Sequence, residues 1–324
     1  EGALLMTVLP YSGVPIFNPD GTFKKEDDVV QGRSFSSNLS KLVKHMDKLE
    51  ALQQGKPPSP IMAHISLTNA CNLTCSFCCF ANRDISEKMP TEKVLKALDS
   101  FRAIGVTGVE FTGGGEPSIH PDFKKIVRYA KDLGFSLGIC TNGARFGANR
   151  PIKKDIVELF DWVRLGMYGF YEGYDYDLSV FEGTNCKPSA AYVWDENLET
   201  SKNPNITGDW TDIKNKRVLS KKFQTTENFI RMLDWIEENK IPCRIAFNAI
   251  KDVKETEKDI ETIRGIIKAY EEDRGHKLQS AFLSDFNFKG ERRNDHCYMH
   301  MVKPFLFTDG YVYACPSAEL SIEN

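Results

Sequence analysis

Residues 62–79 read MAHISLTNACNLTCSFCC, a short apolar strand-like run that leads directly into a group of cysteines. Cys71, Cys75 and Cys78 follow a C-x3-C-x2-C spacing, and Cys79 stands directly after them. Cysteines this close together are poorly placed for disulfides with distant elements, but they are well placed to hold one metal centre. The segment therefore predicts metal ligation at the carboxyl end of a strand.

The spacing of these cysteines favours an iron–sulfur cluster. A loop of this kind lets three thiolates converge on one face of a four-iron cluster, and the fourth iron then stays open to a substrate or cofactor. Cys79 could supply a fourth thiolate, but its adjacency to Cys78 makes ligation of one cluster by both residues awkward. A structural zinc loop, which prefers four tetrahedral ligands, remains an alternative on spacing alone.

Beyond this segment, short strand-like runs alternate with amphipathic helical patterns. The alternation predicts parallel strands joined by right-handed crossovers, with helices packed outside. We expect an α/β fold, a partial (β/α)6 TIM-type barrel whose chemistry gathers at the carboxyl ends of its strands. The expected strands are 62–68, 109–113, 137–143, 162–169, 244–250 and 280–288, and the expected helices are 91–104, 121–133, 226–239 and 256–272.

The regions outside this alternation suggest a domain plan. Residues 1–60 contain a helical pattern at 37–54 and form an N-terminal extension to a barrel of residues 61–290. Residues 171–222 are rich in aromatics, Asn, Asp, Gly and Pro, and we expect an insertion that acts as an ordered lid. Residues 291–324 are expected to form a small auxiliary domain with a β-hairpin.

The bulk composition excludes some classes of protein. The chain has 324 residues and a net charge of −3, which gives no support for a surface that tracks nucleic-acid phosphates or anionic membranes. No apolar run approaches the roughly 20 residues that a membrane helix needs. Nine cysteines in a chain of this size, without a visible export signal, favour metal or cluster ligation in a reducing compartment. We expect a soluble cytosolic protein.

Two further motifs follow the second and third expected strands. The second strand ends in Thr112-Gly113-Gly114-Gly115-Glu116-Pro117, and the third ends in Thr141-Asn142-Gly143. Successive glycines let a ligand approach the backbone, and a neighbouring carboxylate can receive an ammonium group. Because the carboxyl ends of parallel strands meet at one rim, these motifs and the cysteines are expected to share a site.

Together these motifs resemble the radical S-adenosylmethionine superfamily over roughly residues 61–290. Cys71, Cys75 and Cys78 match its cysteine motif, with Phe77 at the position that lies beside the adenine. Gly114, Gly115 and Glu116 match the GGE motif that meets the methionyl ammonium group, and Thr141 and Asn142 match a polar strand end that contacts the ribose or carboxylate. The fourth strand has Gly166 where relatives often have a serine, so contacts there are expected from Arg164 or from elsewhere.

The resemblance implies a [4Fe–4S] cluster and S-adenosylmethionine as cofactors. By the same resemblance, an electron from the reduced cluster cleaves S-adenosylmethionine, and the 5′-deoxyadenosyl radical takes a hydrogen atom from the substrate. A reducing partner such as flavodoxin or ferredoxin is implied as well.

Near the end of the chain, Cys297 and Cys315 bracket a hairpin pattern around Asp309-Gly310. This stretch resembles the opening of the SPASM domain or its shorter twitch version, which holds a second iron–sulfur cluster. The further cysteines of those domains do not follow here, so we expect a truncated or vestigial version, or a cluster that borrows ligands such as Cys186, Cys243, His296 or His300. Two ordinary cysteines beside a hairpin are the simpler alternative.

The substrate is left open by the sequence. A peptide is the leading expectation, because relatives with such auxiliary domains often modify peptides, and a small molecule or nucleoside is a close second. Cys186 is a speculative hydrogen-atom donor, and Tyr168 is a speculative pocket residue. A non-catalytic zinc or iron–sulfur protein is the alternative from another class, although a structural site needs no GGGEP and TNG rim.

Overall fold

The computed structural model describes residues 45–73, 75, 77, 78, 80, 83–168, 176–194, 226–247, 253–283 and 302–314. Cys79, Cys297 and Cys315 lie outside these residues, as do His296 and His300, so the expected second cluster stays a prediction. The same holds for residues 37–44 of the expected N-terminal helix.

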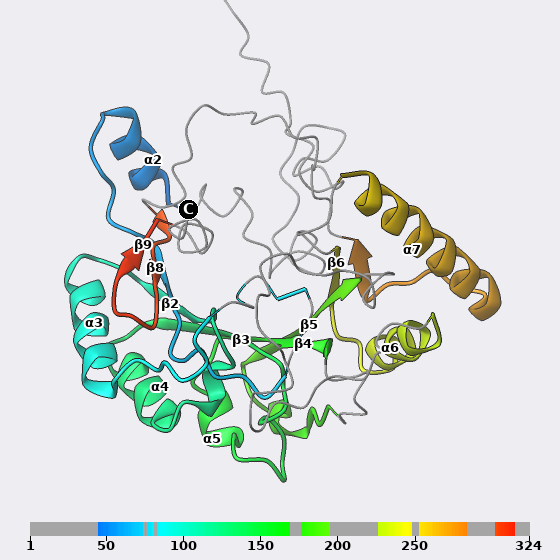
Figure 1. Cartoon of the computed structure of the whole chain (residues 1–324), viewed down its shortest axis with the longest axis horizontal. Coiled ribbons are helices and arrows are strands. Elements are labelled where there is room, and N and C mark those ends of the chain that lie inside the picture. Colours follow the sequence, from blue (N-terminus) through cyan, green and yellow to red (C-terminus); the bar gives the residue numbers. More distant parts are fainter. Residues whose placement is uncertain are drawn as a thin grey trace, which may run out of the picture.

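The described elements alternate between strands and helices along the chain (Figure 1). The strands are β1 (Met62–Ile65), β2 (Gly108–Phe111), β3 (Ser136–Thr141), β4 (Trp162–Gly166), β5 (Lys187–Trp194), β6 (Cys243–Phe247), β7 (Ala281–Leu283), β8 (Phe305–Leu306) and β9 (Val312–Tyr313). The helices are α2 (Met46–Gln53), α3 (Thr91–Ala103), α4 (Phe123–Asp132), α5 (Lys154–Val157), α6 (Thr226–Glu238) and α7 (Val253–Arg274), with 3-10 turns at Pro117–Ile119 and Ser179–Phe181.

All the described strands belong to one sheet, in the order β7-β6-β5-β4-β3-β2-β1-β8-β9. Strands β1 to β7 are parallel, and each pairs with the next along the chain. The sheet ends at β7 and β9 and does not close on itself, which confirms the expected α/β partial barrel. Parallel pairing in chain order also brings the carboxyl ends of β1, β2 and β3 to one rim.

Strand β5 corrects the expected boundaries of the insertion. Residues 171–222 were predicted to lie outside the barrel, yet 187–194 form a strand between β4 and β6. Tyr192 and Trp194 point their rings at Phe229 of α6, with centroids 5.3 and 5.1 Å apart. The expected number of six barrel strands was therefore one too few. Strand β5 was not predicted because it begins with a lysine and a proline inside a segment rich in aromatics, Gly and Pro.

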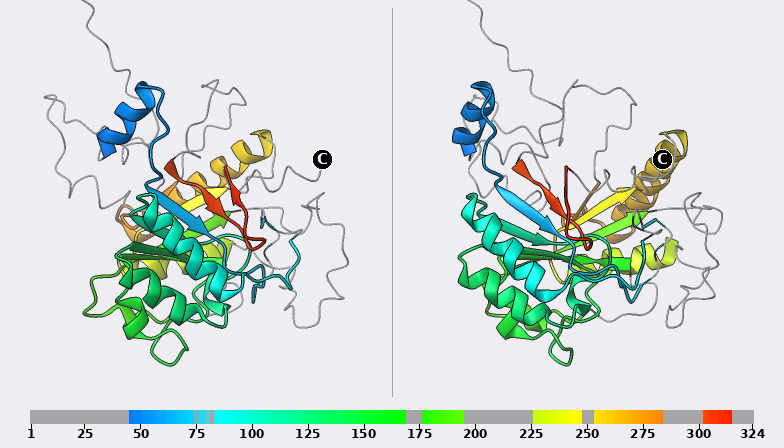
Figure 2. Two further views of the ribbon diagram at one scale, coloured as in Figure 1. Left: turned by 90° about the vertical axis from the view of Figure 1, so that its left-hand side faces the viewer. Right: turned by 60° about the vertical axis from the view of Figure 1, so that its left-hand side comes forward.

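The predicted C-terminal hairpin is present, but it extends the barrel sheet. Strand β8 pairs antiparallel with β9, and the turn between them contains Gly310 at a φ of 90°, a conformation that glycine adopts without strain. Strand β8 also pairs in parallel with β1, so the hairpin lies beside the first strand of the sheet (Figure 2). The described part of 291–324 is thus joined to the barrel through backbone hydrogen bonds, rather than forming a separate domain.

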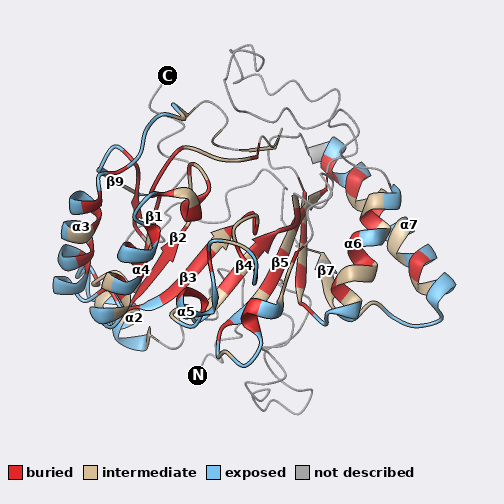
Figure 3. Ribbon diagram, turned by 90° about the horizontal axis from the view of Figure 1, so that it is seen from below, coloured by how far each residue is buried: buried red, intermediate tan, exposed pale blue. Residues whose placement is uncertain are grey.

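The helices take their positions from apolar stripes in their sequences. Buried Val94, Leu98 and Phe101 form one face of α3, and Ile126 and Val127 lie on the corresponding face of α4. Helix α3 packs against α4, and α4 packs against α5. Figure 3 shows buried residues along the strands and on the sheet-facing sides of the helices, with exposed residues on their outer sides.

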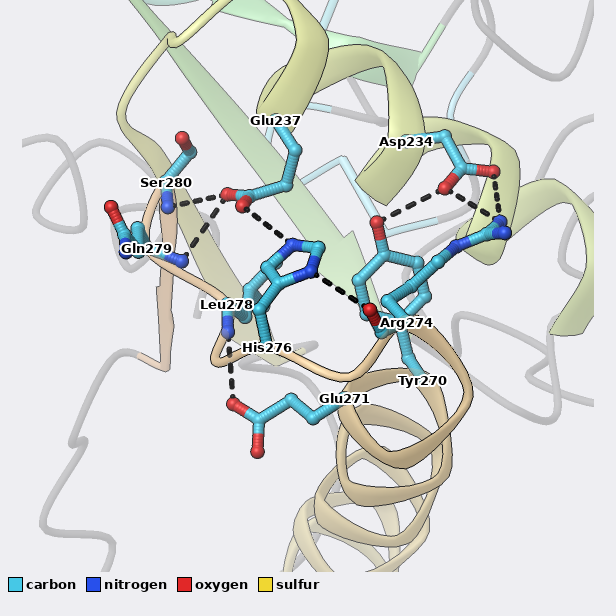
Figure 4. A network of polar contacts seen from close by, with 9 residues as sticks. All are labelled: Asp234, Glu237, Tyr270, Glu271, Arg274, His276, Leu278, Gln279 and Ser280. Carbon is cyan, nitrogen blue, oxygen red and sulfur yellow. Dashed lines mark hydrogen bonds and ion pairs between the residues drawn. The ribbon is translucent and has the colours of Figure 1, made fainter.

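A polar network at the far end of the sheet fixes α6, α7 and β7 to one another (Figure 4). Asp234 of α6 accepts hydrogen bonds from Tyr270 and Arg274 of α7, at 3.0 and 2.9 Å. One residue before β7, the backbone N–H of Ser280 donates to Glu237 Oε1 at 2.6 Å. These contacts position the last helix, although exposed ion pairs of this kind contribute only about 0–1 kcal/mol each. Among the described residues, no helix is both long and apolar enough to cross a bilayer.

If β5 is part of the barrel, its contact with α6 should be essential for stability. We expect Phe229→Ala to lower the free energy of unfolding by about 3–5 kcal/mol, because a fully buried aromatic ring is replaced by a cavity. Urea unfolding of the full chain measures the change. Glu238→Ala, at an exposed position of the same helix, should shift it by less than about 0.5 kcal/mol. Equal effects from both variants would contradict the assignment of β5 to the core.

Candidate active site

A cavity of about 400 Å³ lies at the carboxyl ends of the strands. It brings together the three sequence motifs, which are separated by up to 70 residues in the chain. The predicted residues that line it are Cys71, Cys75, Phe77, Cys78, Gly114, Gly115, Glu116, Thr141, Asn142, Arg164 and Tyr168. Their shared position is a fact of the fold, whereas the role of each toward a ligand stays a prediction.

The cysteine loop is shaped by hydrogen bonds to its sulfur atoms. The Leu73 N–H donates to Cys71 Sγ at 3.5 Å, and Arg83 Nη1 donates to Cys78 Sγ at 3.4 Å. Burial raises the pKa of Cys71 to about 11 and raises the pKa of Cys75 still further above its usual value. In the metal-free protein these thiols are therefore protonated at neutral pH, and a bound metal would replace the protons.

The end of β2 packs tightly against the cysteine loop. The N–H of Gly115 donates to the Thr68 carbonyl at 2.8 Å, and the N–H of Glu116 donates to the Ala70 carbonyl at 2.9 Å. A Cβ atom on Gly115 would overlap the Ala70 carbonyl, and one on Gly114 would overlap the side chain of Asn69. The consecutive glycines are thus required for the contact between two protein loops, in addition to any approach by a ligand.

Glu116 joins the second motif to the third. Its carboxylate is fully buried and accepts hydrogen bonds from Ser118 Oγ at 2.5 Å, from Thr141 Oγ1 at 2.6 Å and from the Asn142 N–H at 2.7 Å. Burial raises the pKa of this carboxyl group, and the hydrogen bonds oppose that shift. In the structure Glu116 thus holds the end of β3 in place, and its contact with an ammonium group stays a prediction.

Asn142 completes the connection back to the cysteines. Its Nδ2 donates to Asn72 Oδ1 at 2.7 Å and lies 3.8 Å from Cys71 Sγ. The hydrogen-bonded path therefore runs from Glu116 through Asn142 to the cysteine loop.

Two aromatic rings meet on the cavity wall. The rings of Phe77 and Tyr168 are 4.8 Å apart in an edge-to-face arrangement. A Cβ on Gly166 would lie 2.5 Å from the Tyr168 ring, so glycine at that position makes room for the tyrosine. Burial raises the pKa of Tyr168, which keeps its phenol protonated. Tyr168 therefore lines the cavity, and any catalytic role for it stays a prediction.

The structure adds residues that the motifs did not indicate. Cys140, Ala191, Val193, Arg244 and Ala246 line the cavity from β3, β5 and β6. The sequence could have identified Arg244 and Ala246 as neighbours, because side chains two residues apart lie on the same face of a strand. Below the cavity, Glu110 Oε2 lies 2.9 Å from His64 Nε2, and Cys140 Sγ donates to Glu110 Oε1 at 3.2 Å. Burial alone would raise the pKa of Glu110, but His64, Arg164 and Lys303 together outweigh it and hold the pKa of this carboxyl group well below its usual value.

Cys186 is not brought to this site. It directly precedes β5 at the amino end of the strand, is 5% exposed, and is absent from the cavity lining. Its backbone N–H donates to Thr184 Oγ1 at 3.3 Å. The sheet places Cys186 at the opposite end of the strand from the cavity, so this geometry does not support a hydrogen-atom transfer from it, and that role stays a prediction.

The C-terminal hairpin supports the cysteine loop from the side. The ring of Phe80, at the end of that loop, stacks on Phe305 and Phe307 with centroids 6.3 and 5.8 Å apart. Glu87 Oε2 accepts hydrogen bonds from Asn69 Nδ2 at 3.1 Å and from Thr308 Oγ1 at 3.3 Å. The hairpin therefore holds the loop through both apolar and polar contacts.

Comparison with known proteins agrees with this geometry. Residues 65–172 match the family model of the Radical SAM superfamily. The cofactors of that family are a [4Fe–4S] cluster and S-adenosylmethionine.

Individual relatives match parts of the chain. The S-adenosylmethionine-dependent nucleotide dehydratase of Selenomonas ruminantium is 36% identical over 98 residues, which are 30% of this chain and 35% of that protein. The sporulation killing factor maturation protein SkfB of Bacillus subtilis (strain 168) is 34% identical over 85 residues, 26% of this chain and 20% of that protein. The matched segments thus span about a third or less of these relatives.

A solved structure resembles most of the chain. The structure of Streptococcus suis SuiB bound to the precursor peptide SuiA superposes with a TM-score of 0.54 and 16% identity over 92% of this chain and 71% of that one. At this identity the likeness concerns the fold.

Three thiols line one cavity, and among the described residues no group of three His, Cys, Asp or Glu side chains is arranged to hold a single metal ion. Thiolates are the usual ligands of a four-iron cluster, so the residues present fit such a cluster. Cys71, Cys75 and Cys78 are the residues that would hold it.

The network around Glu116 generates a prediction for cofactor binding. We expect Glu116→Gln to weaken S-adenosylmethionine binding about tenfold. The amide NH2 group of glutamine would face Ser118, Thr141 or Asn142, which donate hydrogen bonds to the carboxylate of Glu116 and cannot all find an acceptor on an amide. The iron content after reconstitution should stay unchanged. Anaerobic titration calorimetry and iron analysis measure the two quantities, with Glu158→Gln at the exposed C-terminal end of α5 as the control. Loss of iron together with affinity would show that Glu116 acts on the cluster loop instead.

The stacking of Phe80 generates a second prediction. Removal of two ring contacts by Phe80→Ala should loosen the cysteine loop and raise the rate of cluster loss to a chelator about fivefold. The bleaching of the cluster absorbance measures this rate. Tyr311→Ala, at a 71% exposed position of the same hairpin, should leave it unchanged. An unchanged rate in both variants would mean that the hairpin does not support the cluster site.

Proposed function

We propose that this protein cleaves S-adenosylmethionine reductively and uses the resulting radical to take a hydrogen atom from a peptide substrate. The observation that carries the proposal is the convergence of the three cysteines, the GGGEP turn and the TNG turn on one cavity. That cavity continues onto β5 and β6, so it offers room for a substrate beside the cofactors.

The residues of this chain divide the work by their position. When bound, the cluster and S-adenosylmethionine supply a 5′-deoxyadenosyl radical, which is chemistry that the protein side chains lack. Cys71, Cys75 and Cys78 hold the cluster from the loop after β1. Glu116 and Asn142 fix the backbone of the neighbouring turns, and Phe77 packs against Tyr168 at the place proposed for the adenine. These contacts would orient a bound cofactor.

The substrate class rests on weaker support than the radical chemistry. SkfB and the mycofactocin maturase MftC of Mycobacterium ulcerans are named as maturation enzymes, and the solved structure of SuiB contains a precursor peptide. We therefore favour oxidation, epimerisation or cross-linking of a peptide. A reducing protein such as flavodoxin or ferredoxin is the proposed electron donor.

A small molecule or nucleotide is the second candidate substrate. The observation that favours it is the match to a nucleotide dehydratase, which is 36% identical over its 98 matched residues. A non-catalytic zinc or iron–sulfur protein is less well supported, because a structural site does not require a cavity lined by three separate motifs.

The radical chemistry can be tested without knowledge of the substrate. We expect the anaerobically reconstituted protein, reduced in the presence of S-adenosylmethionine, to form 5′-deoxyadenosine that chromatography detects. Cys75→Ala should lower its yield at least about a hundredfold, because the cluster loses one of three thiolate ligands. Cys243→Ala, which removes a buried thiol of β6 outside the cavity lining, is the matched control and should retain the activity. Undiminished cleavage by Cys75→Ala would refute the assignment.

A further inference from the structure

The wall of the cavity formed by β4, β5 and β6 differs from the wall that carries the cofactor motifs. Arg164 of β4 and Arg244 of β6 line it, and Ala191 and Ala246 are the small residues beside them. Alternation along the strands accounts for this arrangement, since Arg244 and Ala246 share one face of β6 while Ile245 between them is buried on the other. The sheet therefore directs two arginines toward one space.

The two guanidinium groups act on each other. Burial is the main cause that lowers the pKa of Arg244, and the positive charge of Arg164 is the next. Both groups remain charged, because the ordinary pKa of arginine lies far above neutral pH. The charges that raise the pKa of Arg164 include that of Glu110, so part of its positive charge is already offset. Each guanidinium presents a fork of planar donors, which matches a carboxylate better than it matches any neutral group.

The position of Arg244 separates it from the methionyl end of the cofactor. The motifs for the cluster and the methionyl group follow β1, β2 and β3, whereas β6 lies three strands beyond β3 in the sheet. At about 4.8 Å per strand, this is roughly 14 Å along the sheet. A group held by Arg244 is therefore more readily supplied by the substrate than by the methionine carboxylate.

We propose that Arg164 and Arg244 form a receptor for a carboxylate of the substrate. This inference rests on the proposed function and specifies its substrate, a peptide that presents an acidic side chain to the cavity. The size of the cavity agrees, because about 400 Å³ lies in the range of pockets for small ligands and is too small for a folded partner. Small Ala191 and Ala246 provide that space beside the arginines.

The test compares two blocked tripeptides that differ only in charge. Acetyl-Gly-Glu-Gly-amide and acetyl-Gly-Gln-Gly-amide are offered as radiolabelled probes to the cluster-loaded protein with saturating S-adenosylmethionine, and equilibrium dialysis measures binding. We expect the glutamate probe to bind at least about tenfold more tightly than the glutamine probe. Arg244→Gln should abolish this preference, and Arg244→Lys should retain part of it because the charge persists without the fork. Arg128→Gln, an exposed arginine of α4, should keep the full preference.

Several results would overturn the proposal. Equal binding of both probes to the unmodified protein would do so, as would an undiminished preference in Arg244→Gln with normal circular dichroism. If Arg244→Gln does not fold, the ratio of glutamate-probe to glutamine-probe binding is measured in Arg244→Lys instead. A ratio equal to that of the unmodified protein would then contradict a role for the guanidinium fork. Tighter binding of the corresponding phosphoserine tripeptide would assign the receptor to phosphate instead.

A further comparison separates the substrate from the cofactor. If Arg244→Gln weakens S-adenosylmethionine binding but not binding of its decarboxylated analogue, the carboxylate belongs to the cofactor and the proposal fails. Formation of 5′-deoxyadenosine is measured on the same preparations. Loss of cleavage with an intact probe preference would refute the proposed function alone, and cleavage without any preference would refute the receptor alone.

Discussion

The close approach of two loops is the constraint on which the rest of this site depends. The turn after β2 donates two backbone hydrogen bonds to the loop after β1. Positions 114 and 115 accept only glycine, because a Cβ atom at either one would overlap that loop. In this arrangement the buried carboxylate of Glu116 accepts hydrogen bonds from Thr141 and Asn142 at the end of β3. The cysteine loop, the glycines and Asn142 are therefore parts of a single packed unit.

The sheet is apolar on its outer face and polar on its inner face. Strands that are buried on both faces usually read as continuous apolar runs. Here Val109 and Ile139 pack toward the helices, whereas Glu110, Arg164 and Arg244 face inward. An interior of this kind is costly to desolvate, which is consistent with a barrel that stays open to receive polar ligands. The apolar contacts that stabilise the fold thus lie on the outer face of the sheet, and the polar side chains that can contact a ligand lie on the inner face.

The C-terminal hairpin connects the last described segment of the chain to the first motif. Strand β8 covers the edge of β1 with backbone hydrogen bonds, and its aromatic rings support Phe80. An uncovered edge would be open to other strands, so the hairpin protects the sheet as well as positioning the cysteine loop. A segment more than two hundred residues away from the cysteines in sequence therefore helps to define their geometry.

The sequence by itself determined the features that depend on local spacing. The cysteine loop, the two turn motifs, helices α3, α4, α6 and α7 and the parallel α/β class could all be predicted, because a helical period or a motif is visible within a few residues. The membership of β5 in the sheet could not, since its proline and small residues resemble a loop until neighbouring strands pair with them. Only the tertiary structure decided that the hairpin joins β1, that Cys186 lies away from the cavity and that Arg164 and Arg244 line the same cavity. These are contacts between distant segments, and the chain sequence carries no local signal for which strands become neighbours.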